Sequence, residues 1–390
     1  MNNSLTNVTL LYTSDVHGSA LPILYGTNEV ADLGLAKYAT IVKDTRDKND
    51  NVIVLDNGDL IQGTPLMTHY VKEHQDKENP MIGIANKIGI DAAVIGNHEF
   101  NFGKKVLTDA INQSEFPWLS ANTISEQTKE PAFGPPYIIK TLADGIKIAI
   151  IGVTTHYIPN WESPEHIKGI HFSDALSTLD TWVQHIHDIE KPDVVIASYH
   201  GGFERDLETG EPTEPLTGEN QGYEMCKKIK GIDVLLTGHQ HRVLNDKVED
   251  TLVIQIGKDA ALYGEIDIQL EYRNEKWSIV DKQASIHSLK GVDSDIEILD
   301  YMESMEASTQ KWIDQPIVFV EGNMFIDDPL QARMKMHPFV NFIQKVQMDM
   351  SGADISATSL FNNTSSGFNS VVTMRDVVSN YMYPNTLVVL

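Results

Sequence analysis

Residues 92–99, Ala92-Ala-Val-Ile-Gly-Asn-His-Glu99, join a short apolar run to side chains that can bind metal ions or move protons. Four other segments share this arrangement. In each of them Asp, Asn or His follows a short apolar run: Asp15-Val-His17 after Val8–Thr13, Asn57-Gly-Asp59 after Val52–Leu55, His200-Gly-Gly after Val194–Ala197, and Gly238-His-Gln-His241 after Val234–Leu236. Because ligands of open α/β sheets bind beyond the carboxyl ends of the strands, these five loops predict one shared site.

The apolar runs alternate with amphipathic stretches, which is typical of a layered α/β domain with sheets flanked by helices. A further strand is expected at Ile146–Val153, and helices at Leu33–Arg46, Gly103–Gln113, Asp174–Ile189 and Glu219–Lys230. Three later runs predict consecutive strands that end the sheet in antiparallel fashion: Thr251–Ile256, Glu265–Glu271 and Trp277–Gln283.

A helix within Asp293–Lys311 is predicted to separate two domains, because its apolar residues recur every three to four positions. We expect a catalytic domain over residues 1–290, a linker helix over 291–314 and part of an α+β substrate-binding domain over 315–390.

The composition excludes several classes of protein. With 30 basic and 55 acidic residues the formal net charge is −25, and such a surface repels the phosphates of a DNA or RNA polymer. No apolar run is long enough to span a membrane. The single cysteine, Cys226, excludes an intrachain disulfide framework. The first ten residues lack the pattern of a signal peptide, so we expect a cytoplasmic protein; the alternative is an exported protein whose signal peptide is absent from this sequence.

The residue types in the five loops indicate a metal site that binds through oxygen and nitrogen. Carboxylate, amide and imidazole ligands without thiolate suit Mn²⁺, Fe or Zn²⁺. Seven ligands are too many for one ion and suit two divalent ions that share a carboxylate. Two such ions, roughly 3.5–4 Å apart, can hold the attacking and leaving oxygens of a displacement at phosphorus. The five loops bring together Asp15, His17, Asp59, Asn97, His98, His200, His239 and His241, from which these ligands would come.

The order and spacing of these motifs over residues 8–285 resemble the calcineurin-like metallophosphoesterase signature in the 5′-nucleotidase family. The resemblance implies that Asp15, His17 and His241 bind one metal ion. It implies that Asn97, His200 and His239 bind the other, with Asp59 bridging, and that His98 is the catalytic histidine beside the leaving group.

The residue after Asn97-His-Glu-Phe is Asn101, where typical 5′-nucleotidases have an Asp that partners the histidine. This variant, together with His241, resembles the branch of 2′,3′-cyclic-nucleotide 2′-phosphodiesterase/3′-nucleotidases. Asn101 can orient His98 through a hydrogen bond but cannot stabilise an imidazolium with charge.

The C-terminal region, with Ala353–Phe361 and Thr373–Asp376, resembles the substrate-binding domain of the same family, which we expect to be truncated here. The resemblance implies that Tyr383 stacks on a base, a contact worth on the order of 1–3 kcal/mol, and that Asn362 and Ser366 approach the nucleoside.

Three functions are therefore to be compared. The first is a two-metal hydrolase of nucleotide phosphoesters, expected to be a 2′,3′-cyclic-nucleotide 2′-phosphodiesterase with 3′-nucleotidase activity that serves nucleotide catabolism. The second is a 5′-nucleotidase or UDP-sugar diphosphatase with the same metal chemistry. The third is a non-enzymatic binding protein, against which the full ligand set argues. The expected partner is a small nucleotide substrate, and no protein partner, nucleic-acid polymer or membrane is indicated.

Overall fold

Two six-stranded sheets form the centre of the first of two structural units in the computed structural model, which describes residues 4–360 and 365–380. This unit comprises Met1–Pro22, Asp32–Gln62 and Tyr70–Asp300. The first sheet has the order β16-β15-β1-β4-β5-β6, and the second has the order β13-β14-β12-β11-β9-β8. The strands of the first sheet are β1 (Ser4–Thr13), β4 (Val52–Asp56), β5 (Ala92–Val94), β6 (Trp118–Leu119), β15 (Leu262–Arg273) and β16 (Lys276–Ser288); those of the second are β8 (Tyr137–Thr141), β9 (Lys147–Thr154), β11 (Val194–His200), β12 (Val234–Thr237), β13 (Val243–Val248) and β14 (Thr251–Ile256).

The main core lies between the two sheets. Side chains alternate between the faces of a strand, and β9 shows this directly. Ile148 and Ile150 join the cluster that holds residues of both sheets, whereas Ala149 and Ile151 pack with α5 and α6. The near-continuous burial of β9, β11 and β12 follows from this position between two layers.

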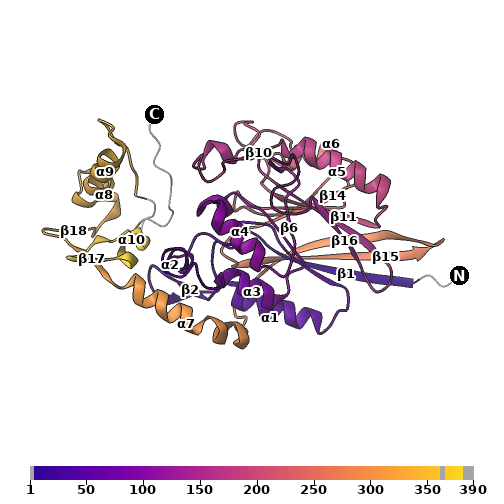
Figure 1. Ribbon diagram of the computed structural model, residues 1–390, viewed down its shortest axis with the longest axis horizontal. Coiled ribbons are helices and arrows are strands. Elements are labelled where there is room, and N and C mark those ends of the chain that lie inside the picture. The colour runs from indigo at the N-terminus through magenta and orange to yellow at the C-terminus, as the bar shows by residue number, and fades with distance from the viewer. Residues whose placement is uncertain (1–3, 361–364, 381–390) are drawn as a thin grey trace. The chain divides into compact units, whose positions relative to one another are not determined.

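Helices cover the outer faces of the sheets. Figure 1 shows α5 and α6 on one side of the strands and α1 and α3 on the other. Helix α3 carries both of its end signals in the sequence: Asn79 accepts hydrogen bonds from two backbone N–H groups at the start, and Gly89 ends the helix with φ 72°. The helices of this unit are α1 (Leu35–Arg46), α3 (Pro80–Ile88), α4 (Gly103–Gln113), α5 (Ala175–Ile189) and α6 (Gly222–Lys228), with short 3₁₀ helices η1 (His98–Phe100) and η2 (Ile158–Asn160), and β7 (Thr123–Ser125) pairs with β10 (Ile170–Phe172).

The predicted α/β layered class is confirmed, and two details of the prediction are wrong. The run Thr251–Ile256 does not precede β15 and β16 in one sheet, because it pairs in parallel with β12 of the second sheet. The helix expected over Glu219–Lys230 begins only at Gly222, because the side chains of Glu219 and Asn220 bond to His239 and to the backbone of Gly202.

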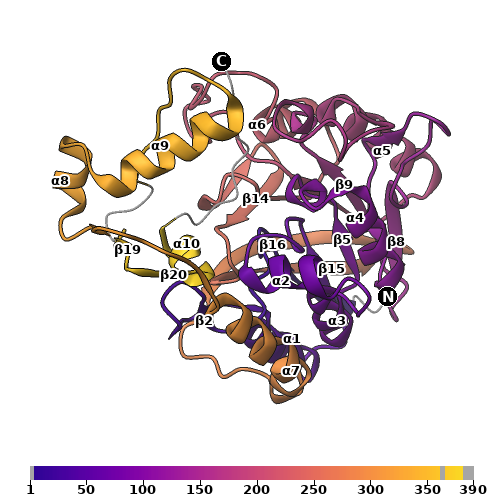
Figure 2. The ribbon, with the colours of Figure 1, turned by 60° about the vertical axis from the view of Figure 1, so that its left-hand side comes forward.

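The second unit comprises Ile23–Ala31, Gly63–His69 and Tyr301–Leu390. Its small core contains Ile326, Phe339, Leu360 and Phe368. Figure 2 shows α9 continuing from α8 near the C-terminal end of the colour range. Its elements are β2 (Ile23–Leu24), β3 (Glu29–Val30), β17 (Pro316–Phe319), β18 (Met324–Phe325), β19 (Gly367–Phe368), β20 (Val371–Thr373), α8 (Pro329–Met334), α9 (Pro338–Ser351) and α10 (Met374–Asn380), while α2 (Pro65–Glu73) and α7 (Ile296–Ile313) have residues in both units. Among the residues that the structure describes, no helix is both long and apolar enough to cross a membrane.

Candidate metal centre and active site

All five predicted loops leave the carboxyl ends of parallel strands. In the first sheet β1 and β4 run parallel, as do β4 and β5, and in the second sheet β11 and β12 run parallel. Backbone hydrogen bonds join the loops of one sheet: Asp15 N–H donates to Gly58 O at 2.9 Å, and Gly238 N–H donates to Gly201 O at 3.0 Å. The rims of both sheets therefore present their polar residues together.

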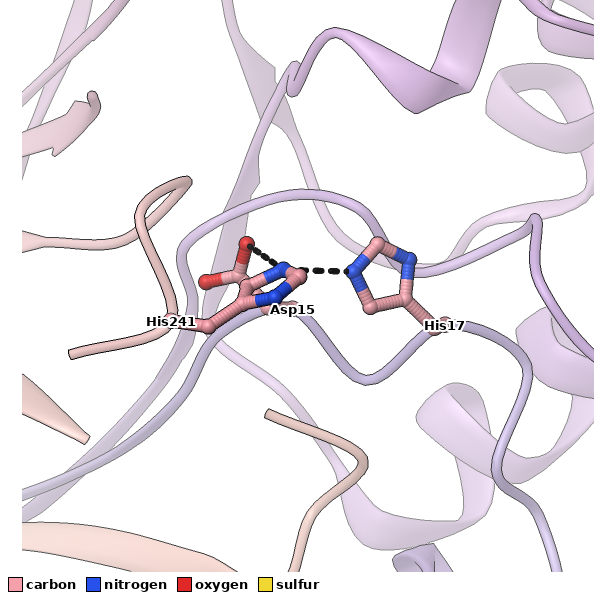
Figure 3. Close-up of side chains that lie close together, drawn as sticks. All are labelled: Asp15, His17 and His241. Carbon is pink, nitrogen blue, oxygen red and sulfur yellow. Dashed lines mark hydrogen bonds and ion pairs between the residues drawn. The ribbon is translucent and has the colours of Figure 1, made fainter. Parts of the chain in front are cut away.

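The first group of donor atoms comes from β1 and β12. His17 Nε2 lies 3.0 Å from His241 Nε2, and His241 Nε2 lies 3.4 Å from Asp15 Oδ1 (Figure 3). Asp15 is fully buried and also accepts hydrogen bonds from the His239 N–H and the Ser14 hydroxyl. Two imidazoles and a carboxylate therefore converge.

The second group comes from β4, β5, β11 and β12. Asn97 Oδ1 lies 3.1 Å from His200 Nε2 and 2.9 Å from His239 Nδ1. His200 Nε2 is also 3.1 Å from Asp59 Oδ2. Asp15, Asp59 and His200 all lie within metal-ligand reach of one another, so the two groups adjoin. All seven predicted ligands are thus brought to one place.

Five of these seven residues adopt left-handed backbone conformations. Their φ angles are 53° for Asp15, 50° for His17, 58° for Asp59, 67° for His239 and 56° for His241. This region is unfavourable for residues with a Cβ atom, and such residues gather at functional sites, where the surrounding structure holds them. The sharp turns direct the side chains away from the sheets and toward a common point.

The donor set fits divalent cations. Asp59 Oδ2 is buried, and among the described residues its one polar contact is the ion pair with His200 Nε2. Burial alone would raise the pKa of Asp59, yet the charges of His200 and His98 hold it well below its ordinary value. Burial would lower the pKa of His200, but the Asp59 carboxylate outweighs burial and raises that pKa to about 10. The site therefore holds negative charge that only protons or cations can balance, and donor atoms around 3 Å apart are what ligands roughly 2.0–2.2 Å from a common ion require.

A second layer of polar groups orients the imidazoles. His200 Nδ1 donates to the Asn57 carbonyl oxygen at 2.6 Å, so Nε2 is the ring nitrogen that faces the site. The Asn57 amide is itself bound by Ser198 Oγ at 2.6 Å. His239 Nε2 lies 3.0 Å from Glu219 Oε1, which leaves Nδ1 facing Asn97. Such partners fix the tautomer and orientation of metal-binding histidines. Glu219 is part of no recognisable motif, so the sequence offers no signal for it.

Glu99 is buried beneath the site and joins two of its loops through hydrogen bonds. Its carboxylate accepts hydrogen bonds from the backbone N–H groups of Asp59, Leu60 and Gly96 at 2.7–2.8 Å. Burial, together with the charge of Asp59, raises the pKa of Glu99 to about 7. It ties the loop after β4 to the loop after β5.

His98 stands beside the donor groups. Its ring centroid is 5.2 Å from that of His17, and its backbone N–H donates to Asp59 Oδ1 at 2.7 Å. His98 Nδ1 lies 2.6 Å from Asn101 Oδ1. An amide oxygen can only accept, so Nδ1 carries the proton and Nε2 is left to exchange a proton with a ligand.

The predicted nucleoside contacts belong to the second unit. Tyr383 and Asn362 lie outside the described residues. Ser366 is described and exposed, and its backbone oxygen accepts a hydrogen bond from Ile326 N–H at 2.8 Å.

Comparison with known families assigns both parts of the chain. Residues 8–243 match the calcineurin-like phosphoesterase family, and residues 323–390 match the 5′-nucleotidase C-terminal domain. The first match covers more than half of the 390 residues.

Individual relatives agree with this assignment. The chain is 28% identical over 372 residues to the trifunctional nucleotide phosphoesterase protein YfkN of Bacillus subtilis, covering 87% of this chain and 25% of that protein. It is 27% identical over 433 residues to the 2′,3′-cyclic-nucleotide 2′-phosphodiesterase/3′-nucleotidase of Haemophilus influenzae, covering 97% of this chain and 64% of the relative. The chain thus spans less than two thirds of these relatives.

A solved structure shows the same fold over nearly the whole chain. A Staphylococcus aureus protein provisionally assigned as a 5′-nucleotidase, in complex with α-ketoglutarate, superposes with a TM-score of 0.85 at 33% identity, covering 98% of this chain and 73% of that chain. The strand-end loops, the converging donor atoms and these matches agree, and the chain belongs to the calcineurin-like phosphoesterase family, with a 5′-nucleotidase C-terminal domain.

Proposed function

We propose that this chain hydrolyses phosphoester bonds of nucleotides with the help of two divalent metal ions. The observation that carries the proposal is the convergence of Asp15, Asp59 and His200 with four further donor side chains at the rim of the two sheets. The chemistry of these donors suits Mn, Fe or Zn.

The proposed ligand sets follow the two donor groups. Asp15, His17 and His241 would hold one ion, Asn97, His200 and His239 would hold the other, and Asp59 would be shared between them. When bound, two such ions activate water for attack at phosphorus and stabilise charge on the phosphoryl oxygens.

His98 is the proposed proton donor to the leaving oxygen. Asn101 Oδ1 accepts the Nδ1 proton of His98, so the doubly protonated ring gives the leaving oxygen its other proton, on Nε2, which points away from Asn101, and the Nδ1–H tautomer remains. With a 2′,3′-cyclic nucleotide, the bond between phosphorus and the 2′ oxygen breaks, that oxygen takes a proton, and a 3′-nucleotide results. A second hydrolysis releases nucleoside and phosphate.

The preferred substrate in this proposal is a 2′,3′-cyclic nucleotide, followed by the 3′-nucleotide. Relatives named for these two activities align with 97–100% of the chain. Residues 1–290 would perform the chemistry, residues 291–314 would connect, and residues 315–390 would hold the nucleoside through Tyr383, Asn362 and Ser366.

A 5′-nucleotidase or UDP-sugar diphosphatase is the second candidate. Relatives named UshA share 34–35% identity with about half of the chain, and the Staphylococcus aureus structure carries a 5′-nucleotidase assignment. The metal chemistry is common to both candidates, and only the nucleoside pocket differs.

A substrate panel with added Mn²⁺ separates the candidates. Comparison of 2′,3′-cAMP, 3′-AMP, 5′-AMP and a UDP-sugar should give the highest kcat/KM for 2′,3′-cAMP. A preference for 5′-AMP or the UDP-sugar supports the second candidate. Failure to hydrolyse all four, and bis(p-nitrophenyl) phosphate as well, contradicts the proposal.

Replacement of His98 tests the proposed chemistry. His98→Gln keeps a polar side chain but cannot move a proton, so kcat should fall by roughly 10²–10⁴-fold. Both metal ions should remain bound, as measured by inductively coupled plasma mass spectrometry, because His98 is not in either ligand set. Unchanged turnover would rule out the assigned role.

A further inference from the structure

A line of polar contacts runs outward from His98 to a turn that lies 61 residues beyond Asn101 in the sequence. His98 Nδ1 lies 2.6 Å from Asn101 Oδ1, and Asn101 Nδ2 donates to Glu162 Oε2 at 2.6 Å. Glu162 Oε1 then lies 2.7 Å from His166 Nδ1. All four residues belong to the first unit.

The outer end of this line sets the direction of the Asn101 amide. An ionised carboxylate only accepts hydrogen bonds, so Glu162 requires the NH₂ group of Asn101 to face it. The Asn101 oxygen must then face His98, and the proton of the imidazole must sit on Nδ1. An Asn101 without Glu162 could present either its oxygen or its nitrogen to His98, and His98 would adopt either tautomer.

Glu162 is held firmly enough to impose this choice. Its side chain is only 7% exposed, and it lies just beyond the short helix η2. Its Oε1 accepts the Ser163 N–H at 2.7 Å in addition to contacting His166, so both oxygens have fixed partners. The Glu162 N–H donates to Ile158 O at 3.0 Å, which fixes the backbone of the turn.

The same turn also contacts the metal side of the site. The indole of Trp161 lies over the His239 imidazole, with ring centroids 5.3 Å apart and planes 33° from parallel. The turn is therefore tied both to a proposed metal ligand and to the proposed proton donor.

We propose that Glu162 is a positioning residue, which acts through Asn101 to hold His98 as the tautomer with the proton on Nδ1. The predicted effect of Glu162 on turnover rests on the proposed function. The tautomer itself is a property of the folded chain.

A reciprocal exchange of donor and acceptor tests the inference. In Glu162→Gln, the Ser163 N–H keeps an oxygen at the Oε1 position and thereby turns the new NH₂ group toward the Asn101 NH₂ group. Asn101 must flip, and His98 should change to the tautomer with the proton on Nε2. In Asn101→Asp alone, the new carboxylate at position 101 faces the Glu162 carboxylate, and the two negative charges repel each other. In the double variant, the new carboxylate at position 101 accepts from both His98 and the new amide at position 162, and the original arrangement returns.

The expected kinetics are strongly non-additive. The substrate is the nucleotide of the panel that is hydrolysed fastest, because its sugar oxygen needs a proton to leave, and an amide NH₂ group facing Nδ1 disfavours the doubly protonated ring that donates it. With Mn²⁺, kcat should fall roughly 10-fold or more in each single variant and return to within about 3-fold of the original in Asn101→Asp/Glu162→Gln. KM should change little. Glu165→Gln, three residues along the same turn and exposed, is the matched control and should leave kcat unchanged. Equal or greater loss in the double variant overturns the inference.

A spectroscopic measurement separates this inference from the proposed function. Long-range ¹H–¹⁵N spectra of the zinc-loaded protein, with His98 assigned from His98→Gln, report the tautomer without any need for turnover. We expect the proton on Nδ1 in the original chain and in the double variant, and on Nε2 in Glu162→Gln. The same tautomer in all of them overturns the inference. If the original chain hydrolyses no phosphoester, the proposed function fails, and the spectra alone decide the role of Glu162.

Discussion

Asp59 is the residue on which the charge of the site depends most. Its Oδ1 accepts the His98 N–H, and its Oδ2 faces His200. Asp59→Asn should preserve the shape and the first contact while removing the charge. We expect the chain to lose at least one bound metal ion and kcat to fall by more than about 100-fold, since a charge held by two cations is worth several kcal/mol.

Metal content and turnover, measured on the same preparation, check this prediction. Asp188→Asn on the exposed side of α5 is the matched control and should change neither quantity. Two ions per chain in Asp59→Asn would exclude a bridging role for Asp59.

Asp56, behind the rim, is predicted to make stability depend on pH. Burial raises its pKa to about 8, although the Thr13 hydroxyl and the Gly58 N–H oppose the shift. Unfolded Asp has a pKa of about 3.9. Between these values the folded state holds a proton that the unfolded state lacks. The contribution of Asp56 is therefore complete below about pH 4 and is lost as the pH rises toward about 8.

Asp56→Asn cannot ionise and should lose this dependence. Relative to the original chain, its free energy of unfolding should rise by as much as about 1.4 kcal/mol per pH unit between pH 5 and pH 8. Urea unfolding of both chains in the presence of EDTA, at several pH values, measures the difference. Parallel pH profiles would contradict the prediction.

The sequence predicts the candidate ligands that follow strands more readily than the residues that orient these ligands through hydrogen bonds. Asp15, Asp59, Asn97, His200 and His239 could be predicted to converge, because each follows an apolar strand and has a ligand side chain. Glu162 and Glu219 could not, because the contacts of Glu162 with Asn101 and of Glu219 with His239 come from loops that no periodicity or motif connects to these residues. Their positions depend on tertiary packing alone.

At the scale of the elements, close contact between neighbouring loops limits what can stand at the end of β5. A Cβ added at Gly96 would lie 2.3 Å from Asp59 Oδ1 and 2.5 Å from Asp59 N. Gly96→Ala should therefore push the loop after β5 away from the loop after β4, with a loss of metal affinity of at least roughly 10-fold in titration calorimetry, because misplaced supports of metal ligands cost about that much or more.

Asn79→Ala distinguishes this effect from simple destabilisation. Asn79 caps α3 and is not part of the site, so its loss should reduce the free energy of unfolding by about 1 kcal/mol and leave metal affinity unchanged. Equal metal affinity in Gly96→Ala and Asn79→Ala would contradict the predicted displacement of the loop after β5.

The sequence predicts the positions of strands and helices better than it predicts which strands pair. The elements that the sequence predicts in the first unit lie close to where period and composition place them, whereas it gives no sign of α3, β8 and β13. The sequence does not predict that β14 belongs to the second sheet, because a strand's own pattern does not identify its neighbour. All six residues of β14 are buried because this strand lies inside its sheet. Many residues of β16 are exposed because β16 is an edge strand.

At the scale of the whole molecule, metal binding should stabilise the first unit selectively. Ions at 100 times their Kd add about 2.7 kcal/mol to the folded state that binds them. For a unit of this size, that corresponds to a rise in Tm of roughly 5 °C or more. Calorimetric scans with Mn²⁺ and with EDTA should show the rise in one transition. The shift should shrink in Asp59→Asn; an equal shift there would indicate binding elsewhere.

The left-handed turns at five ligand positions have a consequence for how such a protein can change over time. Each costs about 1 kcal/mol that glycine would not incur. A mutation of His17 or His241 to Gly should therefore abolish catalysis and increase the free energy of unfolding of the metal-free chain. Substitutions that remove the activity can therefore also increase stability, so the strained ligand residues persist only while selection for turnover continues.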